Sequence, residues 1–380
     1  MNLYVWLTRT MLIERLLGVT VYAGLLLIMY LSIRGAKDSK TLCKVLNVYI
    51  VLLCIMAFFY IPGENADLFR WRQIFDMYGW AQKPFLTFLH EHVFQASTPV
   101  AYLYMYLCNI TGIHGILPLF CAGIFYSNVF YILKNLHCRH GVSAHSVAEL
   151  LLMFMSAGCF LEVISGVRCL VALSVLGRCF YDEIYNNKSI FKCILWEGLA
   201  ALTHSMAAVL LAGRLVFWLF QNKQRGVKQV VNLVMICVIA AIAFKYGSEY
   251  FVAAYNKGLS YLLSDDTYSY SWEFLMRGLV VLQMVIIFTG TPKTSTRPEL
   301  KDIKRFSVIC FVLDVVFIAF DYNVFHRLNT FLLIVMMPLA GIAMDRNKYH
   351  LTSMIRLLSL LILALACTRG NLCGYKFFLL

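Results

Sequence analysis

Long apolar runs, most of them near 20 residues, follow one another along the chain and are separated by charged residues and by clusters of Gly, Pro and Asn. A helical run of this length crosses the hydrocarbon core of a bilayer, because each residue advances the helix by about 1.5 Å. The pattern predicts an all-α, polytopic integral membrane protein with a single domain over residues 1–380. Ten full spans are expected, at 12–33, 42–61, 113–133, 145–164, 167–184, 228–245, 273–290, 305–320, 327–344 and 351–368.

Two long connections, 62–112 and 246–272, are expected to form loops on the outer side of the membrane. The first begins with a charged segment, residues 67–76, which we expect to be a loop. The apolar segments that follow it, 84–94 and 99–110, are too short to cross the bilayer. They are typical of interfacial or re-entrant helices that lie on the membrane.

The segment 191–220 has too many residues for one span and few for two, and His204 and Ser205 interrupt its middle. We expect a hairpin of two short helices, 191–203 and 205–220, that returns to the side from which it entered. With this hairpin, 18 Lys and Arg side chains fall on the inner side and 7 on the outer side; with a single crossing the split is 11 against 14. Because inner loops carry the excess of positive charge, the hairpin is favoured, with both chain ends outside.

Composition agrees with a membrane protein. Hydrophobic residues make up 61% of the chain and charged residues 14%, whereas about a quarter of the residues of a soluble domain are charged. The mean hydropathy is +0.73. The net charge of +13 is explained by the inner loops, so nucleic acid is not needed as a partner. The 13 cysteines lie mostly in apolar runs without a CxxC pair, which argues against a disulfide framework or a zinc site.

Residues that could carry chemistry are expected in the outer half of the membrane: Asp67, Arg168, His204, Asp321 and Arg327. Arg168 lies between two apolar runs, where an arginine costs a few kcal/mol unless it has a partner. An anionic ligand or an acidic neighbour such as Glu162 would supply one, and snorkelling to lipid headgroups is the alternative. Arg327 at the start of a later span has the same two interpretations. Two guanidinium groups on one side would suit a pyrophosphate.

His204, at a helix break, could be a general base, or it could only bond a freed backbone carbonyl. Asp67 could act as a base or as a metal ligand, although an acidic loop residue is more often simply solvated. Asp314 lies inside an apolar span and needs a partner, but we expect it to lie away from the other candidates. Lower weight is given to two short polar pairs, His90 with His92 and Asp265 with Asp266.

Four motifs follow in order along the chain: Asp67-Leu-Phe-Arg-Trp-Arg-Gln-Ile-Phe, Ser165-Gly-Val-Arg168-Cys-Leu-Val-Ala172, Leu199-Ala-Ala-Leu-Thr-His204-Ser205 and His326-Arg327-Leu. Together they resemble the EpsG-like branch of the Wzy polysaccharide polymerases. Two positions depart from the family pattern, with Trp71 in place of Tyr and Cys169 in place of Gln.

The resemblance implies a membrane glycosyltransferase of the C class on the outer face of a bacterial inner membrane. It implies transfer of a growing glycan from undecaprenyl pyrophosphate to a hydroxyl of the next lipid-linked repeat unit, as for O-antigen, capsule or exopolysaccharide. By this analogy Arg168 and Arg327 hold the pyrophosphate, and His204 or Asp67 positions or deprotonates the hydroxyl. Neither a metal nor another cofactor is expected, and a chain-length regulator is an expected partner. The remaining expected substrate contacts are Arg70, Arg72, Ser165, Ser205 and Asp321.

Other classes of protein remain alternatives. A lipid-linked-oligosaccharide flippase would show internal repeats and charges serving both faces, which the sequence lacks. A glycosyltransferase that uses a polyprenyl-phosphate sugar would explain Glu64 and Asp67 but not His204 and Arg327. A membrane O-acyltransferase could use His204, but no acyl-donor site is recognised.

Overall fold

A computed structural model describes residues 3–62, 66–157, 160–221, 271–291, 298–318, 322–346, 350–368 and 376–377. In the first half of the chain the α-helices are α1 (Leu3–Arg34), α2 (Ser39–Phe58), α3 (Asp67–Met77), α4 (Phe85–Phe88), α5 (Pro99–Asn109), α6 (Ile116–His140), α7 (Ala144–Ala157), α8 (Phe160–Ser165) and α9 (Cys169–Phe180). The later α-helices are α10 (Ile190–Thr203), α11 (Ser205–Gln221), α13 (Ser271–Gly290), α14 (Pro298–Ile318), α15 (Tyr322–Arg346) and α16 (His350–Thr368).

Other regular elements are short. A 3-10 helix, η1 (Trp80–Gln82), and two π-helical turns, η2 (Leu89–Val93) and η3 (Tyr181–Tyr185), connect the helices. Strands β1 (Tyr60–Ile61) and β2 (Lys376–Phe377) form one antiparallel pair, with Tyr60 opposite Phe377. The expectation of an all-α fold is confirmed apart from this pair.

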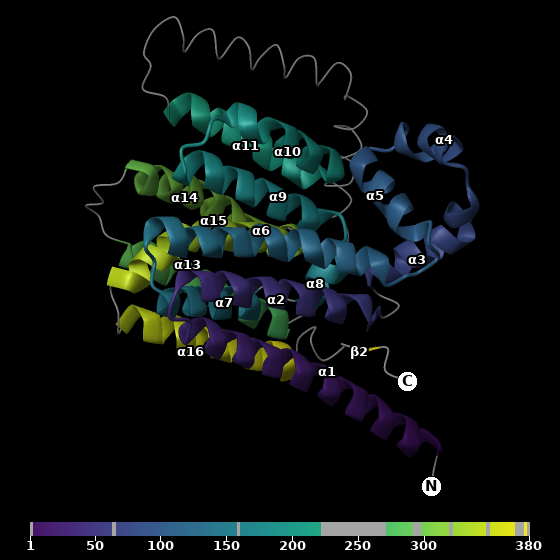
Figure 1. Ribbon diagram of the computed structural model, residues 1–380, viewed down its shortest axis with the longest axis horizontal. Coiled ribbons are helices and arrows are strands. Elements are labelled where there is room, and N and C mark those ends of the chain that lie inside the picture. The colour runs from purple at the N-terminus through teal and green to yellow at the C-terminus, as the bar shows by residue number, and fades with distance from the viewer. Residues whose placement is uncertain are drawn as a thin grey trace, which may run out of the picture.

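The long helices lie alongside one another in a bundle, and α3, α4 and α5 form a lobe at one end of it (Figure 1). Helix α15 is the central element, because it packs against α6, α7, α9, α13, α14 and α16. Its apolar side chains are buried on all sides, including Phe331 and Met337. By contrast, Leu27 on α1 and Val51 on α2 are more than half exposed, which is typical of helices that face lipid.

Within the part of the chain that the structure describes, four helices are long and apolar enough to cross a membrane: Ser39–Phe58, Ile116–His140, Val324–Arg346 and His350–Cys367. Helix is present at every other expected span that falls on described residues, although 145–164 is divided into α7 and α8. The expected span 228–245 and most of the loop 246–272 lie outside the described residues. The total of ten spans stays a prediction.

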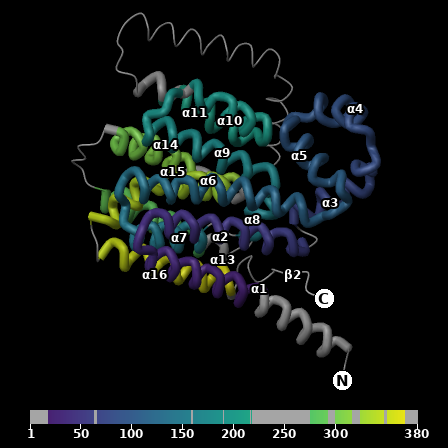
Figure 2. Tube along the Cα trace, viewed as in Figure 1, coloured from purple at the N-terminus to yellow at the C-terminus, as the bar shows by residue number. Residues whose placement is uncertain are grey.

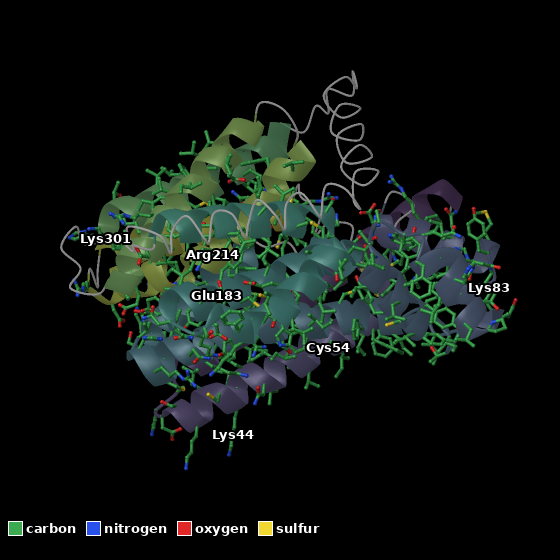
Figure 3. The ribbon with its side chains drawn as sticks, turned by 90° about the horizontal axis from the view of Figure 1, so that it is seen from above. Lys44, Cys54, Lys83, Glu183, Arg214 and Lys301 are labelled. Carbon is green, nitrogen blue, oxygen red and sulfur yellow. The ribbon has the colours of Figure 1, made fainter. Side chains whose placement is uncertain are left out.

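The expected hairpin is present as α10 and α11, which pack against each other. Arg214, near the middle of α11, contacts the carboxylate of Glu183 in η3 with an N–O distance of 3.4 Å (Figure 3). His204 separates the two helices and contributes to a cavity. The chain therefore turns back at His204.

The expectation that residues 67–76 form a loop is wrong, because they form α3. Their charges suggested a loop, but Leu68, Trp71 and Phe75 recur at helical spacing and are buried on one face. This face joins an aromatic cluster in the lobe, in which Trp71 and Trp80 have ring centroids 6.4 Å apart. The expected short helices in 84–94 and 99–110 are observed as α4, η2 and α5.

The two ends of the bundle differ in charge. Lys83 lies in the lobe, whereas Lys44 and Lys301 lie toward the opposite end (Figure 3). The chain trace in Figure 2 shows that the α6–α7 connection also lies at the end opposite the lobe. Arg139 and His140 in the last turn of α6 therefore add to the basic end. This distribution is the one expected if the lobe faces outward.

Packing of α2 against α6 supplies a test of the fold. A Cβ atom on Gly115, the residue before α6, would lie 2.5 Å from the carbonyl oxygen of Phe58 at the end of α2. We expect Gly115→Ala to lower the midpoint of thermal unfolding in detergent, because such overpacking costs about 1–3 kcal/mol. In Gly123→Ala, the control on the same helix, the new Cβ meets Cys54 Sγ at 3.5 Å, an ordinary contact. Equal midpoints for the two variants would contradict the α2–α6 packing described here.

Candidate functional site

A cavity of about 250 Å³ lies between the lobe and the bundle. Its lining comes from α3, the α8–α9 turn, the hairpin tip and the start of α15: Asp67, Arg70, Trp71, Ile74, Gly166, Val167, Arg168, Cys169, His204 and Arg327. Four candidates that are far apart in the sequence, Asp67, Arg168, His204 and Arg327, are thus brought to one place. Their catalytic roles stay predictions.

The α8–α9 turn is held in place by its own backbone and by neighbouring helices. Gly166 donates its N–H to the carbonyl of Glu162 at 2.6 Å, and a Cβ atom at Gly166 would lie only 2.7 Å from that oxygen. The carbonyl of Val167 accepts a hydrogen bond from the Tyr104 hydroxyl of α5 at 2.5 Å. The turn is therefore fixed where it presents Arg168 to the cavity.

Arg168 contacts the lobe through weak polar and aromatic interactions. Its guanidinium carbon lies 4.7 Å from the centroid of the Trp71 ring, and its Nη1 donates to Thr98 Oγ1 at 3.4 Å. Stacking on an aromatic face orients a guanidinium without neutralising its charge. Arg168 forms no ion pair with any described residue. The sequence suggested Glu162 as its acidic neighbour, but Glu162 pairs with Arg277 instead.

Arg327 lines the cavity from the first turns of α15. Like Arg168, it forms no ion pair within the described part of the chain. Arg327, Arg168, Asp67 and Cys169 all line this one cavity. The two guanidinium groups therefore converge although α9 and α15 are separate helices.

Asp67 and Arg70 lie at the more open side of the cavity. Asp67 is in the first turn of α3, and its Oδ1 is 3.7 Å from Nη1 of Arg70, with the two side chains 49% and 65% exposed. An exposed pair of this kind contributes little to stability. Both charges are therefore available to a ligand.

His204 forms the hairpin tip. Its own N–H donates to the carbonyl of Ala200 and ends α10, while its Nδ1 accepts the N–H of Met206 at 3.2 Å in the first turn of α11. The residue thus satisfies backbone groups on both sides of the break, as polar backbone inside a membrane requires.

Other expected contacts lie elsewhere. Arg72 donates to the carbonyls of Tyr60 and His114 at 3.4 and 3.3 Å, because residues two apart on a helix point in nearly opposite directions and Arg70 takes the cavity side. Ser165 at the end of α8 and the exposed Ser205 do not line the cavity. Asp321 lies outside the described residues.

Of His90 and His92, the second lies beside a lysine, with 3.1 Å between Lys83 Nζ and His92 Nε2. Lys83 donates to Glu91 Oε2 at 2.7 Å, and this ammonium holds the pKa of the Glu91 carboxyl below its usual value. Burial, followed by the charge of Lys83, lowers the pKa of His92. No group of three potential metal ligands is found in the residues that the structure describes.

A buried polar network that sequence reasoning missed adjoins the cavity. Arg277 of α13 is fully buried and contacts Glu162 Oε2 of α8 at 3.2 Å, the carbonyl of Ala157 at 3.2 Å and His326 Nε2 at 3.4 Å. Glu162 also contacts His326, the residue before Arg327. An arginine inside an apolar span is costly and therefore indicates a polar partner. Arg277, in the expected span 273–290, is such a residue and could have been identified from the sequence.

Asp314 belongs to this network, although it does not line the cavity with the other candidates. Asn329 of α15 donates to Asp314 Oδ2 at 3.2 Å and accepts from Arg277 Nη1 at 3.4 Å. The network therefore joins α8, α13, α14 and α15. It lies next to the α8–α9 turn, which carries Arg168, and next to the start of α15, which carries Arg327.

Comparison with known proteins gives no relative for this site: no family model, no curated protein and no solved structure matches the chain. Function must therefore be inferred from the chemistry of the cavity.

The network predicts a large effect on stability. Arg277→Met leaves the carboxylate of Glu162 in the bundle without its guanidinium, and breaking a buried pair in this way costs about 3–5 kcal/mol. The control Arg305→Met removes a more exposed arginine, 3.8 Å from Asp302, and should change stability by less than about 1 kcal/mol. Thermal unfolding in detergent should show a much lower midpoint for the first variant alone. Similar midpoints would contradict the assigned network.

Proposed function

We propose that this protein is a polysaccharide polymerase. It joins oligosaccharide repeat units carried on undecaprenyl pyrophosphate, at the outer face of a bacterial inner membrane, as the resemblance to the EpsG-like Wzy polymerases implies. The observation that carries the proposal is the convergence of Arg168 and Arg327 on one cavity with Asp67 and His204. The substrates are two lipid-linked glycans, one as donor and one as acceptor.

The charge of the cavity supports a pyrophosphate ligand. Arg70, Arg168 and Arg327 oppose the single carboxylate of Asp67, so the lining has an excess of two positive charges with His204 neutral. A pyrophosphate diester carries one negative charge on each phosphate and would balance this excess. Guanidinium groups suit it because each offers a planar set of donors to phosphate oxygens. A polyprenyl-phosphate sugar, with a single phosphate, would leave part of the excess uncompensated.

Glycosyl transfer from this ligand places the developing charge where the arginines lie. A hydroxyl oxygen of the acceptor attacks the anomeric carbon of the donor glycan, and the bond from that carbon to the phosphate oxygen breaks. The bonding pair leaves with the pyrophosphate, while the hydroxyl proton passes to a base in the cavity. Fixed cations at the leaving group lower the barrier because they stabilise this charge more in the transition state than in the ground state.

The positions of Arg168 and Arg327 suit this role. Trp71 and Thr98 orient Arg168 from the lobe, and the polar network holds the helix start that bears Arg327. Neither guanidinium has a carboxylate partner among the described residues that would compete with a ligand. This preorganisation avoids part of the cost of arranging charges during the reaction.

The hairpin next to the cavity suits a lipid-linked substrate. Leu202 and Val209, on either side of His204, are 49% and 68% exposed. Within a bilayer these apolar side chains face lipid, so a polyprenyl chain could stay in the membrane while its pyrophosphate enters the cavity. A flippase would also meet such a lipid, but no described feature favours transport over transfer.

Arg168→Ala tests the reaction. Purified protein with a lipid-linked repeat unit should form a ladder of glycans, and the variant should slow ladder formation by about a hundredfold or more, as expected for loss of a transition-state donor. Cells with this variant should display at most one repeat unit on the lipid acceptor. Arg305→Ala, which removes an exposed arginine outside the cavity lining, is the control. Long ladders from Arg168→Ala would refute the proposal.

The outer location has its own test. Thr87 in the lobe and Lys40 near the start of α2 are both exposed, so a cysteine added at either position should be reachable by a reagent on its own side. With the exposed Cys138 replaced by Ser, Thr87→Cys should react with a membrane-impermeant maleimide added outside the inner membrane. Lys40→Cys should react only after the membrane is opened. The reverse pattern would place the cavity on the cytoplasmic side.

A further inference from the structure

Helix α2 packs against α6 in an antiparallel orientation. Gly123 of α6 lies next to Cys54 of α2, since a Cβ atom at Gly123 would be 3.5 Å from the Cys54 sulfur. Nearer the basic end of the bundle, the Lys134 ammonium of α6 donates to the side-chain oxygen of Asn47 in α2. Residue numbers rise along α6 as they fall along α2, so this packing brings the last turn of α6 to the start of α2.

Two cysteines meet where the packed pair reaches the basic end. Cys43 lies in the second turn of α2 and Cys138 in the last turn of α6, and their Sγ atoms are 3.8 Å apart. Cys138 is exposed and Cys43 is partly exposed. The residues that follow them, Lys44 and Arg139, are exposed charged groups. The two thiols therefore contact each other at a surface that a dissolved reagent can reach.

The helices hold these sulfurs in a position from which they can bond. A disulfide needs its sulfurs at about 2.05 Å, closer than the thiols lie. Rotation about χ1 of either cysteine moves its sulfur without moving the backbone of the helix. Because α2 and α6 keep the two side chains in contact, no other segment has to move for the bond to form.

A second pair of thiols shows what distinguishes the first. Cys179 of α9 and Cys193 of α10 also form a side-chain hydrogen bond, but both are buried in the bundle. An oxidant dissolved in water reaches exposed thiols far more readily than buried ones. Exposure together with contact therefore selects Cys43 and Cys138.

We propose that Cys43 and Cys138 form a reversible disulfide in response to peroxide at the inner face of the membrane. The proposal uses the predicted inner location of the basic end but not the proposed polymerase activity. Thiols that face the cytoplasm are kept reduced, so the pair is a dithiol in unstressed cells.

Hydrogen peroxide supplies the oxidising equivalents. The exposed sulfur of Cys138 loses its proton and attacks one peroxide oxygen, the O–O bond breaks, water leaves, and a sulfenic acid remains. The sulfur of Cys43 then attacks the sulfenic sulfur, the S–O bond breaks, and the hydroxyl group leaves as water with the Cys43 proton. Two thiols and one peroxide thus give one disulfide and two waters. A small thiol reverses the reaction by exchange and is itself oxidised.

Mass spectrometry of the full chain tests the bond. Protein in membranes is treated with hydrogen peroxide, its remaining thiols are blocked with N-ethylmaleimide in denaturant, and it is digested without a reducing agent. We expect a peptide that joins Cys43 to Cys138 and that separates when dithiothreitol is added. Cys179 and Cys193 should both carry N-ethylmaleimide. Absence of the linked peptide, or a link between Cys179 and Cys193 in its place, would overturn the proposal.

Single substitutions test the order of the steps. In Cys43→Ser, the sulfenic acid of Cys138 has no second thiol to react with, so dimedone should label Cys138 during peroxide treatment. In Cys138→Ser, Cys43 should be labelled more slowly, because it is less exposed. Faster labelling of Cys43 would overturn the assigned order.

The cross-link should also be visible in stability. The loop that it closes contains β1, the lobe and α6, and closing a loop restricts the unfolded chain. We expect peroxide to raise the midpoint of thermal unfolding of the wild type in detergent and to leave that of Cys43→Ser unchanged. A lowered midpoint of the wild type would show that the bond disrupts the α2–α6 packing and would count against the proposal.

The state of the pair in cells tests its reversibility. Cells are quenched with N-ethylmaleimide before peroxide, after it, and after its removal. Cys43 and Cys138 should be reduced, then linked, then reduced again. A disulfide already present before peroxide would make the bond a permanent cross-link and would overturn the switch. None of these measurements depends on polymerase activity, so failure of the proposed function would be seen separately.

Discussion

A guanidinium group inside a membrane-spanning bundle needs a counter-charge. Some of the described arginines have a carboxylate partner within the fold, and others do not. Arg277, Arg214 and Arg356 each form an ion pair with a carboxylate from another element of the fold. Arg168 and Arg327 form none with the described residues, and both line the cavity. The fold thus neutralises these three arginines and leaves the two guanidinium groups of the cavity without a carboxylate among the described residues. On the proposed function, an anionic substrate completes that balance.

The paired arginines and the cavity arginines depend on each other through short stretches of chain. Glu162 is one helical turn before the residues that present Arg168, and His326 directly precedes Arg327. Contacts of Arg277 with Glu162 and His326 therefore hold the two segments together. Burying such a polar network costs free energy. This network also fixes the separation of Arg168 and Arg327, which carry like charges and would otherwise repel each other.

The break at His204 solves a second problem of the membrane environment. A chain that turns inside the bilayer exposes backbone groups that no water can satisfy, and the side chain and backbone of His204 bond groups on both sides of the turn. One residue therefore ends α10 and caps α11 at the cavity.

By itself, the sequence determined the elements that depend on local composition. Apolar run lengths predicted the long helices, the interruption at His204 together with the distribution of basic residues predicted the hairpin, and the cost of a charge in an apolar run pointed to Arg168. The charges of residues 67–76 suggested a loop. The helical spacing of Leu68, Trp71 and Phe75, which are buried, is the signal for α3 that this interpretation left out.

Only the tertiary structure decided which groups meet. Glu162 pairs with Arg277 rather than with Arg168, and Asp314 joins the network near the cavity, because helices distant in sequence lie side by side around α15. Sequence spacing carries no information on such neighbours. The cap formed by His204 was equally out of reach, since it depends on a distance of 3.2 Å to the backbone N–H of Met206. Composition and period determine what each segment can become, and packing determines what each side chain touches.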